Sequence, residues 1–284
     1  MTHFNIKNIG AKALFFLMLI ALVFLLAYYG RKPESSDTAG NLQSASPTAS
    51  DSQESAQPPS ISQDPAEQTA SPTTSATSPS EELAVPPDLS TREPRDDEFF
   101  SDAAFMGNSL MDGFRLFSGL TTCDYYAATS MTVVGATSKP CITLDSGAQG
   151  TLVDGLIQKR YGKIYILLGI NEIGFDVQTY IDYYSAMLDT IIAAQPDCDI
   201  YLMGITPVSA AKSGSGEVFN MTRIKEYNTA LRQLAADKGC YYMDLVSVLA
   251  GPDGYLPASE TTDGVHLSAK MYKTWLDYVR THYA

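Results

Sequence analysis

Five short apolar runs, separated by longer segments of helical periodicity, constrain the fold of this chain more than any other feature. The runs are typical of buried strands, which we expect at residues 103–106, 125–128, 163–168, 199–203 and 241–244. Apolar residues recur every three or four positions between and after these runs, which predicts helices at residues 111–117, 179–194, 221–238 and 268–282. Strands that alternate with helices indicate an α/β fold, with a parallel sheet covered by helices on both faces.

The N-terminal third of the chain has a different character. Residues 13–29 are an uninterrupted apolar stretch, near the lower length limit for a transmembrane helix. A cleavable signal peptide is the alternative, but no small-x-small cleavage site follows the stretch, and no nearby cysteine could carry a lipid. We therefore expect a short tail at residues 1–12 and an uncleaved signal-anchor at 13–29. The rest of the protein would then lie outside the cytoplasm, held to the membrane by this helix.

Residues 30–95 are expected to form a disordered linker. Between residues 33 and 90 the chain has no lysine, arginine or aromatic residue, so this segment cannot bury enough apolar surface to fold. The same segment carries nine acidic residues, and much of the net charge of −13 therefore belongs to the linker. The acidic balance and the lack of a basic patch argue against nucleic acid as a partner. Residues 96–284 remain for one domain with a substantial core, which we expect to be a monomer.

A histidine near the C-terminus is the main candidate for a general base. The chain has three histidines, of which His3 precedes the apolar stretch and His282 lies two residues from the end. His266 is therefore the best-placed imidazole, and Asp263 could orient it and stabilise its protonated form. Alone, the Asp-x-x-His spacing also fits a turn followed by the start of a helix.

Two further polar residues follow predicted strands. Ser109 comes after the first strand, at the start of a helix, where its hydroxyl would project above the sheet and its amide could bind an oxyanion. Asn171 follows the third strand, and its side-chain amide could be a second oxyanion donor. Each residue also has a purely structural reading as a cap. Ligands of such sheets bind beyond the carboxyl ends of the strands, where all these residues converge.

These motifs resemble those of the SGNH (GDSL-type) hydrolase family, over residues 105–266. The resemblance implies a flavodoxin-like three-layer sandwich with a five-stranded parallel sheet. It also implies that Ser109 of the Gly-Asn-Ser-Leu block is the nucleophile and that Asn171 is an oxyanion donor. Asp263 and His266 would complete the catalytic triad.

The chain departs from the family pattern at three places. Asn108 and Glu172 stand where the family has aspartate, before the nucleophile and after the oxyanion asparagine. The family also has a glycine after the second strand whose amide completes the oxyanion hole. Ser130 matches that position best, and Gly135 is the nearest glycine.

The resemblance implies a serine esterase that works through an acyl-enzyme, without metal or cofactor. The sequence has no His/Cys cluster of zinc spacing and no glycine-rich phosphate loop. We expect a short-chain ester substrate, such as an O-acetyl group on a small molecule or a carbohydrate. An acyltransferase that uses the same triad, and a non-catalytic surface module that binds a glycan or a protein, are the alternatives.

Two features bear on the structure outside the triad. Four cysteines lie in the predicted domain, and an oxidising exterior would permit the disulfides Cys123–Cys141 and Cys198–Cys240. Residues 209–216 are rich in serine, glycine and alanine, which predicts a loop near the active-site edge of the sheet.

Overall fold

The computed structural model describes residues 84–216 and 218–284. The predicted tail at residues 1–12, the signal-anchor at 13–29 and the linker up to residue 83 lie outside this part of the chain. Among the residues that the structure does describe, no helix is long and apolar enough to cross a membrane.

The domain is built on a five-stranded sheet in which every neighbouring pair is parallel, in the order β2-β1-β5-β6-β7. The strands are β1 (Ala103–Gly107), β2 (Asp124–Ala127), β5 (Lys163–Leu167), β6 (Asp199–Met203) and β7 (Tyr241–Met243). All five strands predicted from the sequence are confirmed. A two-stranded antiparallel ribbon, β3 (Ile142–Thr143) and β4 (Gln149–Gly150), is additional. Its strands are too short to show a periodic pattern.

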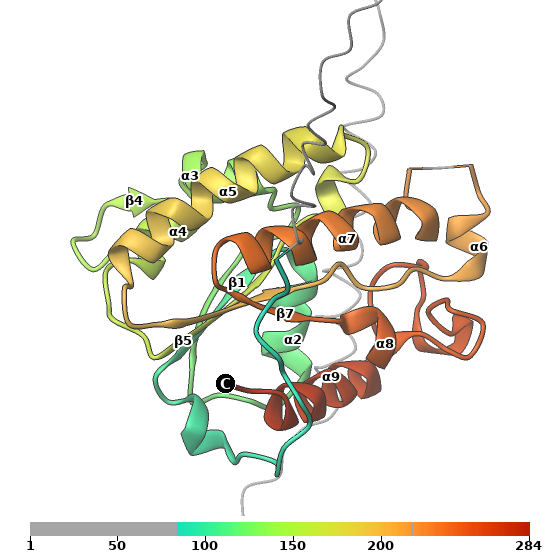
Figure 1. The fold of residues 1–284 in the computed structure, drawn as a ribbon, viewed down its shortest axis with the longest axis horizontal. Helices are drawn as coiled ribbons and strands as arrows, with labels where there is room; N and C mark the ends of the chain where they lie inside the picture. The colour runs from blue at the N-terminus through green and yellow to red at the C-terminus, as the bar shows by residue number, and fades with distance from the viewer. Residues whose placement is uncertain (1–83, 217) are drawn as a thin grey trace, which may run out of the picture. The chain divides into compact units, whose positions relative to one another are not determined.

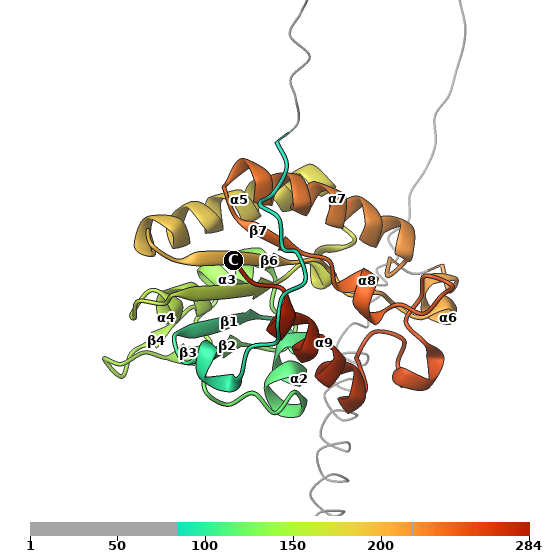
Figure 2. The same cartoon turned by 60° about the horizontal axis from the view of Figure 1, so that its bottom comes forward.

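Helices cover both faces of the sheet (Figures 1 and 2). The α-helices are α2 (Ser109–Phe117), α3 (Val133–Ser138), α4 (Leu152–Leu156), α5 (Val177–Ala194), α6 (Ala210–Ser213), α7 (Met221–Asp237), α8 (Leu245–Leu249) and α9 (Ala269–Thr281). Three short 3₁₀ helices are η1 (Asp97–Phe100), η2 (Ile170–Glu172) and η3 (Ala258–Glu260). The helices α2 and α9 lie on one face, and α5 and α7 lie on the other (Figure 2). The four helices predicted from periodicity correspond to α2, α5, α7 and α9, whereas α6 lies within the predicted loop.

An aromatic ladder crosses the sheet on the face toward α2 and α9. Its rings belong to residues in register on all five strands, namely Tyr125, Phe105, Tyr165, Tyr201 and Tyr241. Neighbouring ring centroids lie 5.6, 4.4, 4.5 and 5.0 Å apart, with interplanar angles below 30°. Phe114 of α2 stacks on Phe105 and contacts Trp275 of α9, with centroid distances of 5.3 and 4.7 Å. The ladder therefore ties this helix layer to the sheet.

The folded part of the chain begins before Asp96. Residues 84–95, which we expected in the disordered linker, lie against the domain. The Arg92 amide donates to the Thr281 carbonyl at 2.7 Å, and the Arg95 amide donates to the Arg280 carbonyl at 3.0 Å. The Tyr283 hydroxyl donates to the Glu93 carbonyl at 3.1 Å. Low hydrophobicity suggested disorder here, but backbone hydrogen bonds hold this segment to the C-terminal residues.

The two disulfides expected from the sequence are not present, because all four cysteines are free. For Cys198 and Cys240 the strand register explains the result. Pairing of Tyr201 with Tyr241 places Cys240 opposite Ile200, two residues from Cys198. That offset separates the two cysteine Cα atoms by about 8 Å, beyond the roughly 7 Å that a disulfide spans.

Candidate active site

In the first turn of α2, one residue caps the helix and the next presents a hydroxyl group. Asn108 is the N-cap residue, and its side-chain oxygen accepts the Leu110 amide at 3.0 Å. Ser109 is therefore not the cap, and its hydroxyl is available for another partner. The site lies at the carboxyl end of β1, the edge of such a sheet at which ligands bind.

Ser109, His266 and Asp263 form one hydrogen-bonded chain. The Ser109 Oγ lies 2.9 Å from His266 Nε2, and His266 Nδ1 lies 2.6 Å from Asp263 Oδ2. The other carboxylate oxygen of Asp263 accepts the amides of Val265 and His266 at 2.9 and 2.8 Å. The aspartate is thus held by the same turn that carries the histidine. This geometry suits proton transfer from the serine to the imidazole.

The electrostatics keep Asp263 ionised. Partial burial by itself would raise the pKa of this carboxyl. Hydrogen bonds from the His266 ring and from the His266 and Val265 amides outweigh burial and lower the pKa of Asp263 to about 2. An ionised carboxylate at Nδ1 leaves Nε2 of a neutral imidazole free to accept the serine proton.

A tight turn between Asp263 and His266 places both side chains. Gly264 has φ +85°, and a Cβ there would lie 2.7 Å from both the Ser209 Oγ and the Lys212 Cβ. The Ser209 amide donates to the Gly264 carbonyl at 2.9 Å. The N-terminal end of α6, which Ser209 caps, therefore packs directly behind the turn that carries the acid and the base.

Two predicted oxyanion donors, Asn171 and Ser130, follow the carboxyl ends of β5 and β2, whereas Gly135 does not fit the role. Asn171, in η2, donates from Nδ2 to the Met131 carbonyl at 2.8 Å, which joins it to the loop after β2. Ser130 lies in that loop with φ +59°, a conformation that favours glycine. Among the described residues no hydrogen bond uses the Ser130 amide. The Gly135 amide is bound to the Thr132 hydroxyl at 2.9 Å and lies inside α3. Ser130, not Gly135, is therefore the candidate donor.

Glu172 is a buried residue whose importance the sequence did not indicate beyond a departure from a family pattern. The residue is 3% exposed, and its Oε1 accepts the Val133 amide at the start of α3. Burial raises the pKa of Glu172 to about 7, and the Val133 hydrogen bond offsets this only in part. Its run of apolar neighbours could have suggested burial, but not its partner 39 residues earlier in the chain.

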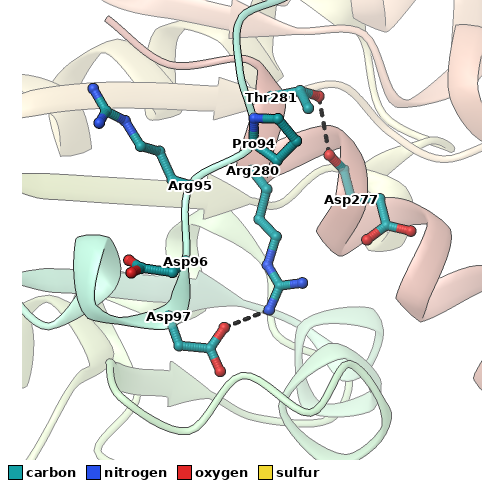
Figure 3. A pocket seen from close by; sticks show the side chains of 7 residues that line it. All are labelled: Pro94, Arg95, Asp96, Asp97, Asp277, Arg280 and Thr281. Carbon is teal, nitrogen blue, oxygen red and sulfur yellow. Dashed lines mark hydrogen bonds and ion pairs between the residues drawn. The ribbon is translucent and has the colours of Figure 1, made fainter.

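The structure has one cavity beside the triad and another at the opposite edge of the sheet. A cavity of about 390 Å³ borders Asp263 and Gly264 and is lined by residues of α6 and its two flanks, and by η3 and the loop after it. A cavity of about 510 Å³ is lined by Pro94, Arg95, Asp96, Asp97, Asp277, Arg280 and Thr281. Figure 3 shows the Arg280–Asp97 ion pair within it. This second cavity lies by η1, which precedes the amino end of β1, so it is at the sheet edge opposite Ser109.

Within residues 84–216 and 218–284, no three His, Cys, Asp or Glu side chains are grouped so that they could hold a metal ion.

Comparisons with known proteins place this chain in a family. The GDSL-like Lipase/Acylhydrolase family matches residues 105–274. A Streptococcus pneumoniae structure, named for platelet activating factor, is 22% identical, with a TM-score of 0.51 over 63% of this chain and 81% of that one. A GDSL-like lipase from Bacteroides thetaiotaomicron is 13% identical, with a TM-score of 0.48 over 64% and 87% of the two chains. No curated protein is significantly similar in sequence.

Proposed function

The chain belongs to the GDSL-like lipase/acylhydrolase family of serine ester hydrolases, and from that premise we propose that Ser109, His266 and Asp263 are its catalytic triad. The observation that carries the proposal is the unbroken hydrogen-bonded chain from the Ser109 hydroxyl through the imidazole to an ionised carboxylate.

The reaction would proceed in two steps. Ser109 Oγ attacks the ester carbonyl while His266 Nε2 takes the hydroxyl proton, and Asp263 stabilises the imidazolium. The tetrahedral oxyanion would be bound by the amides of Ser109 and Ser130 and by the second Nδ2 proton of Asn171, the first being held by Met131. The imidazolium then protonates the leaving alcohol as the acyl-enzyme forms. Water, deprotonated by the same histidine, releases the acid and restores the serine.

The test compares hydrolysis of a short-chain aryl ester by the full-length chain and by its Ser109→Ala variant. We expect kcat to fall by about 10³-fold or more, because the nucleophile is removed while the oxyanion donors remain. Ser101→Ala, at the opposite end of β1 and exposed, is the matched control and should keep full activity. Equal rates in the wild type and in Ser109→Ala would refute the triad.

We further propose that the substrate is a short-chain ester, such as an acetyl ester, of a polar alcohol such as a carbohydrate. The support is the cavity beside Asp263, which hydroxyl side chains line: Ser209, Ser215, Thr261 and Thr262. These hydroxyl groups could form hydrogen bonds with the hydroxyl groups of such an alcohol. We expect kcat/KM on aryl esters to fall as the acyl chain lengthens from acetyl to octanoyl, and a rise with length would contradict the proposal. Product analysis with a sugar acceptor would reveal acyl transfer in place of hydrolysis.

We also propose that residues 13–29 anchor the protein in a membrane, with residues 30–83 as a spacer and the catalytic domain outside the cytoplasm. The support is the apolar stretch and the acidic, aromatic-free composition that follows it. The full-length chain should sediment with membranes, and deletion of residues 13–29 should release it. Recovery of the full-length chain in the soluble fraction would contradict the anchor.

A further inference from the structure

Glu172 occupies an unusual place for an acidic residue. It is the last residue of η2, directly after Asn171, and its side chain is almost fully buried. Its Oε1 accepts the Val133 amide, whereas its Oε2 has no hydrogen-bond partner among the described residues. A buried carboxyl with one unsatisfied oxygen is costly, so the interaction it makes with Val133 calls for a functional explanation.

The hydrogen bond to Val133 acts on the loop that carries a candidate oxyanion donor. This loop runs from the end of β2 to the start of α3 and contains Ser130 in its left-handed conformation. Asn171 donates to the Met131 carbonyl at 2.8 Å, and Glu172 accepts the Val133 amide two residues later. Two consecutive residues of η2 therefore hold the loop by hydrogen bonds, Asn171 to a carbonyl and Glu172 to an amide.

Hydrogen bonds from α7 in turn hold η2 and the residues that follow it. The Tyr227 hydroxyl of α7 lies 2.6 Å from the Glu172 carbonyl and 2.8 Å from the Phe175 carbonyl. Arg223, one turn earlier in α7, donates to the carbonyls of Ile173 and Phe175. The titratable groups near the Glu172 carboxyl are thus Tyr180 and Tyr184 of α5 and Tyr227 of α7. The charged Arg223 of α7 is bound to the Ile173 and Phe175 carbonyls, and α3 contributes its Val133 amide.

We propose that Glu172 is a positioning residue, whose carboxylate holds the loop from Ser130 to Val133 against η2 so that the Ser130 amide and Asn171 Nδ2 converge on one oxyanion. The proposal rests on the proposed function, since it assigns to Glu172 the geometry of that same site. Glu172 does not touch the reacting atoms.

Three substitutions of Glu172 separate its possible contributions. Glu172→Gln keeps an acceptor oxygen for Val133 without the charge, and its kcat should stay within about threefold of the wild type at pH 8. Glu172→Leu keeps the volume but removes the acceptor, and its kcat should fall about 10- to 100-fold with KM nearly unchanged, in the range for a disturbed oxyanion donor. Glu172→Asp withdraws the carboxylate by about 1.5 Å and should resemble the leucine variant. Exposed Glu98→Gln, at the opposite sheet edge, is the control.

The same hydrogen bond can be removed from its other end. Val133 is the first residue of α3, and Thr132 before it is extended with φ −108° and ψ 167°. Proline is tolerated at this helix position and after an extended residue, so Val133→Pro deletes the amide proton without breaking α3. Its kcat should fall as in Glu172→Leu. The double variant should be no worse than the poorer single variant, because both changes remove one interaction.

The pH dependence gives a readout that a merely structural role would not move. His266 must be unprotonated to act as the base, so log kcat should fall with acid on that account alone. Glu172, whose pKa is raised by burial to about 7, binds Val133 most strongly as a carboxylate, and its protonation should steepen the fall. Relative to Glu172→Gln, the wild-type kcat should therefore fall further through pH 7, by no more than the roughly threefold difference expected between a charged and a neutral acceptor.

Rates are expressed per active site, by titration of Ser109 with a fluorophosphonate, so that poorly folded protein does not count. A kcat per site that stays at the wild-type level in Glu172→Leu and Val133→Pro would overturn the proposal while leaving the triad intact. Should Ser109→Ala retain activity, the proposed function itself would fail. Glu172→Leu with lowered kcat but wild-type melting temperature would support the positioning role most directly.

Discussion

At the residue scale, the backbone conformation decides which polar side chains cap a helix or turn and which are available to the site. Asn108 turns its side chain back onto the Leu110 amide, so the helix is capped without using the Ser109 hydroxyl. Asp263 accepts two amides of its own turn and also holds the His266 ring. Either residue could have served only as a cap. The hydrogen bonds show that Asn108 does so, whereas Asp263 also orients His266.

Ser130 is the residue whose backbone departs most from what its side chain favours. It is the only non-glycine residue with positive φ in the described part of the chain. That conformation costs a residue with a Cβ about 1 kcal/mol or more. Ser130→Gly should therefore raise the free energy of unfolding by about 0.5–1 kcal/mol, after allowance for the greater freedom of glycine in the unfolded chain. Its kcat should be unchanged, because the amide is kept.

Urea unfolding and ester hydrolysis, measured on the same preparations, check this prediction. Ser130→Val is the matched control, since a β-branched residue is strained in this region and should lower stability and activity together. A glycine variant that folds normally but loses activity would show that the Ser130 side chain, and not its amide, serves the site.

At the element scale, the strands are connected by their side chains as well as by their backbones. The aromatic ladder uses one position of each strand, so a shift of one residue in any strand would move its ring to the other face. Ladder rings also differ in how their hydroxyls are satisfied. The Tyr201 hydroxyl accepts the Ala284 amide at 3.0 Å, whereas the Tyr165 hydroxyl is buried with no partner among the described residues.

This difference predicts opposite effects of one chemical change. Tyr165→Phe removes a buried, unpaired hydroxyl and keeps the ring, so the free energy of unfolding should rise by about 1 kcal/mol. Tyr201→Phe removes the partner of the Ala284 amide and should lower it by about 0.5–1.5 kcal/mol. Equilibrium unfolding in urea measures both values. Equal shifts in the two variants would contradict the argument.

At the scale of the whole domain, segments distant in the sequence meet at both edges of the sheet. The carboxyl edge brings together Ser109, Asn171 and the turn of His266, from the ends of β1, β5 and the region after β7. At the amino edge, residues 92–95 are hydrogen-bonded to the C-terminal end of α9 and to Tyr283 after it.

The amino-edge contacts predict where the domain can be cut. A chain that starts at Asp96 loses the backbone hydrogen bonds of Arg92 and Arg95 and the contacts of both guanidinium groups with the Tyr283 ring, at 5.1 and 4.6 Å. We expect it to be less stable than a chain that starts at Ala84 by about 1–3 kcal/mol, since part of the interaction energy is offset by the freedom of the released segment. Thermal unfolding of the two chains checks this, and identical melting temperatures would contradict it.

The sequence by itself determined the elements with strong local signals. The runs at 163–168 and 199–203 are long and apolar enough to predict β5 and β6, and the three- and four-residue spacing predicts α5, α7 and α9. The candidate triad was also predictable, because scarcity of histidine leaves His266, the spacing selects Asp263, and Ser109 follows the first strand in a block that resembles the family's nucleophile motif. A pattern within one segment was sufficient for the helices and strands, whereas the candidate triad required several separate motifs considered together.

Only the tertiary structure decided the features that depend on which segments meet. The short elements β3, β4, α3, α4 and α8 have too few residues for periodicity to show. The choice of Ser130 over Gly135 required the backbone angle of one residue and the hydrogen bond of the other. The predicted Cys198–Cys240 disulfide was wrong because the strand register offsets the two cysteines by two residues. The partner of Glu172, the Val133 amide, lies 39 residues earlier in the chain. Register and long-range hydrogen bonds are set by packing of the whole domain, which no local pattern records.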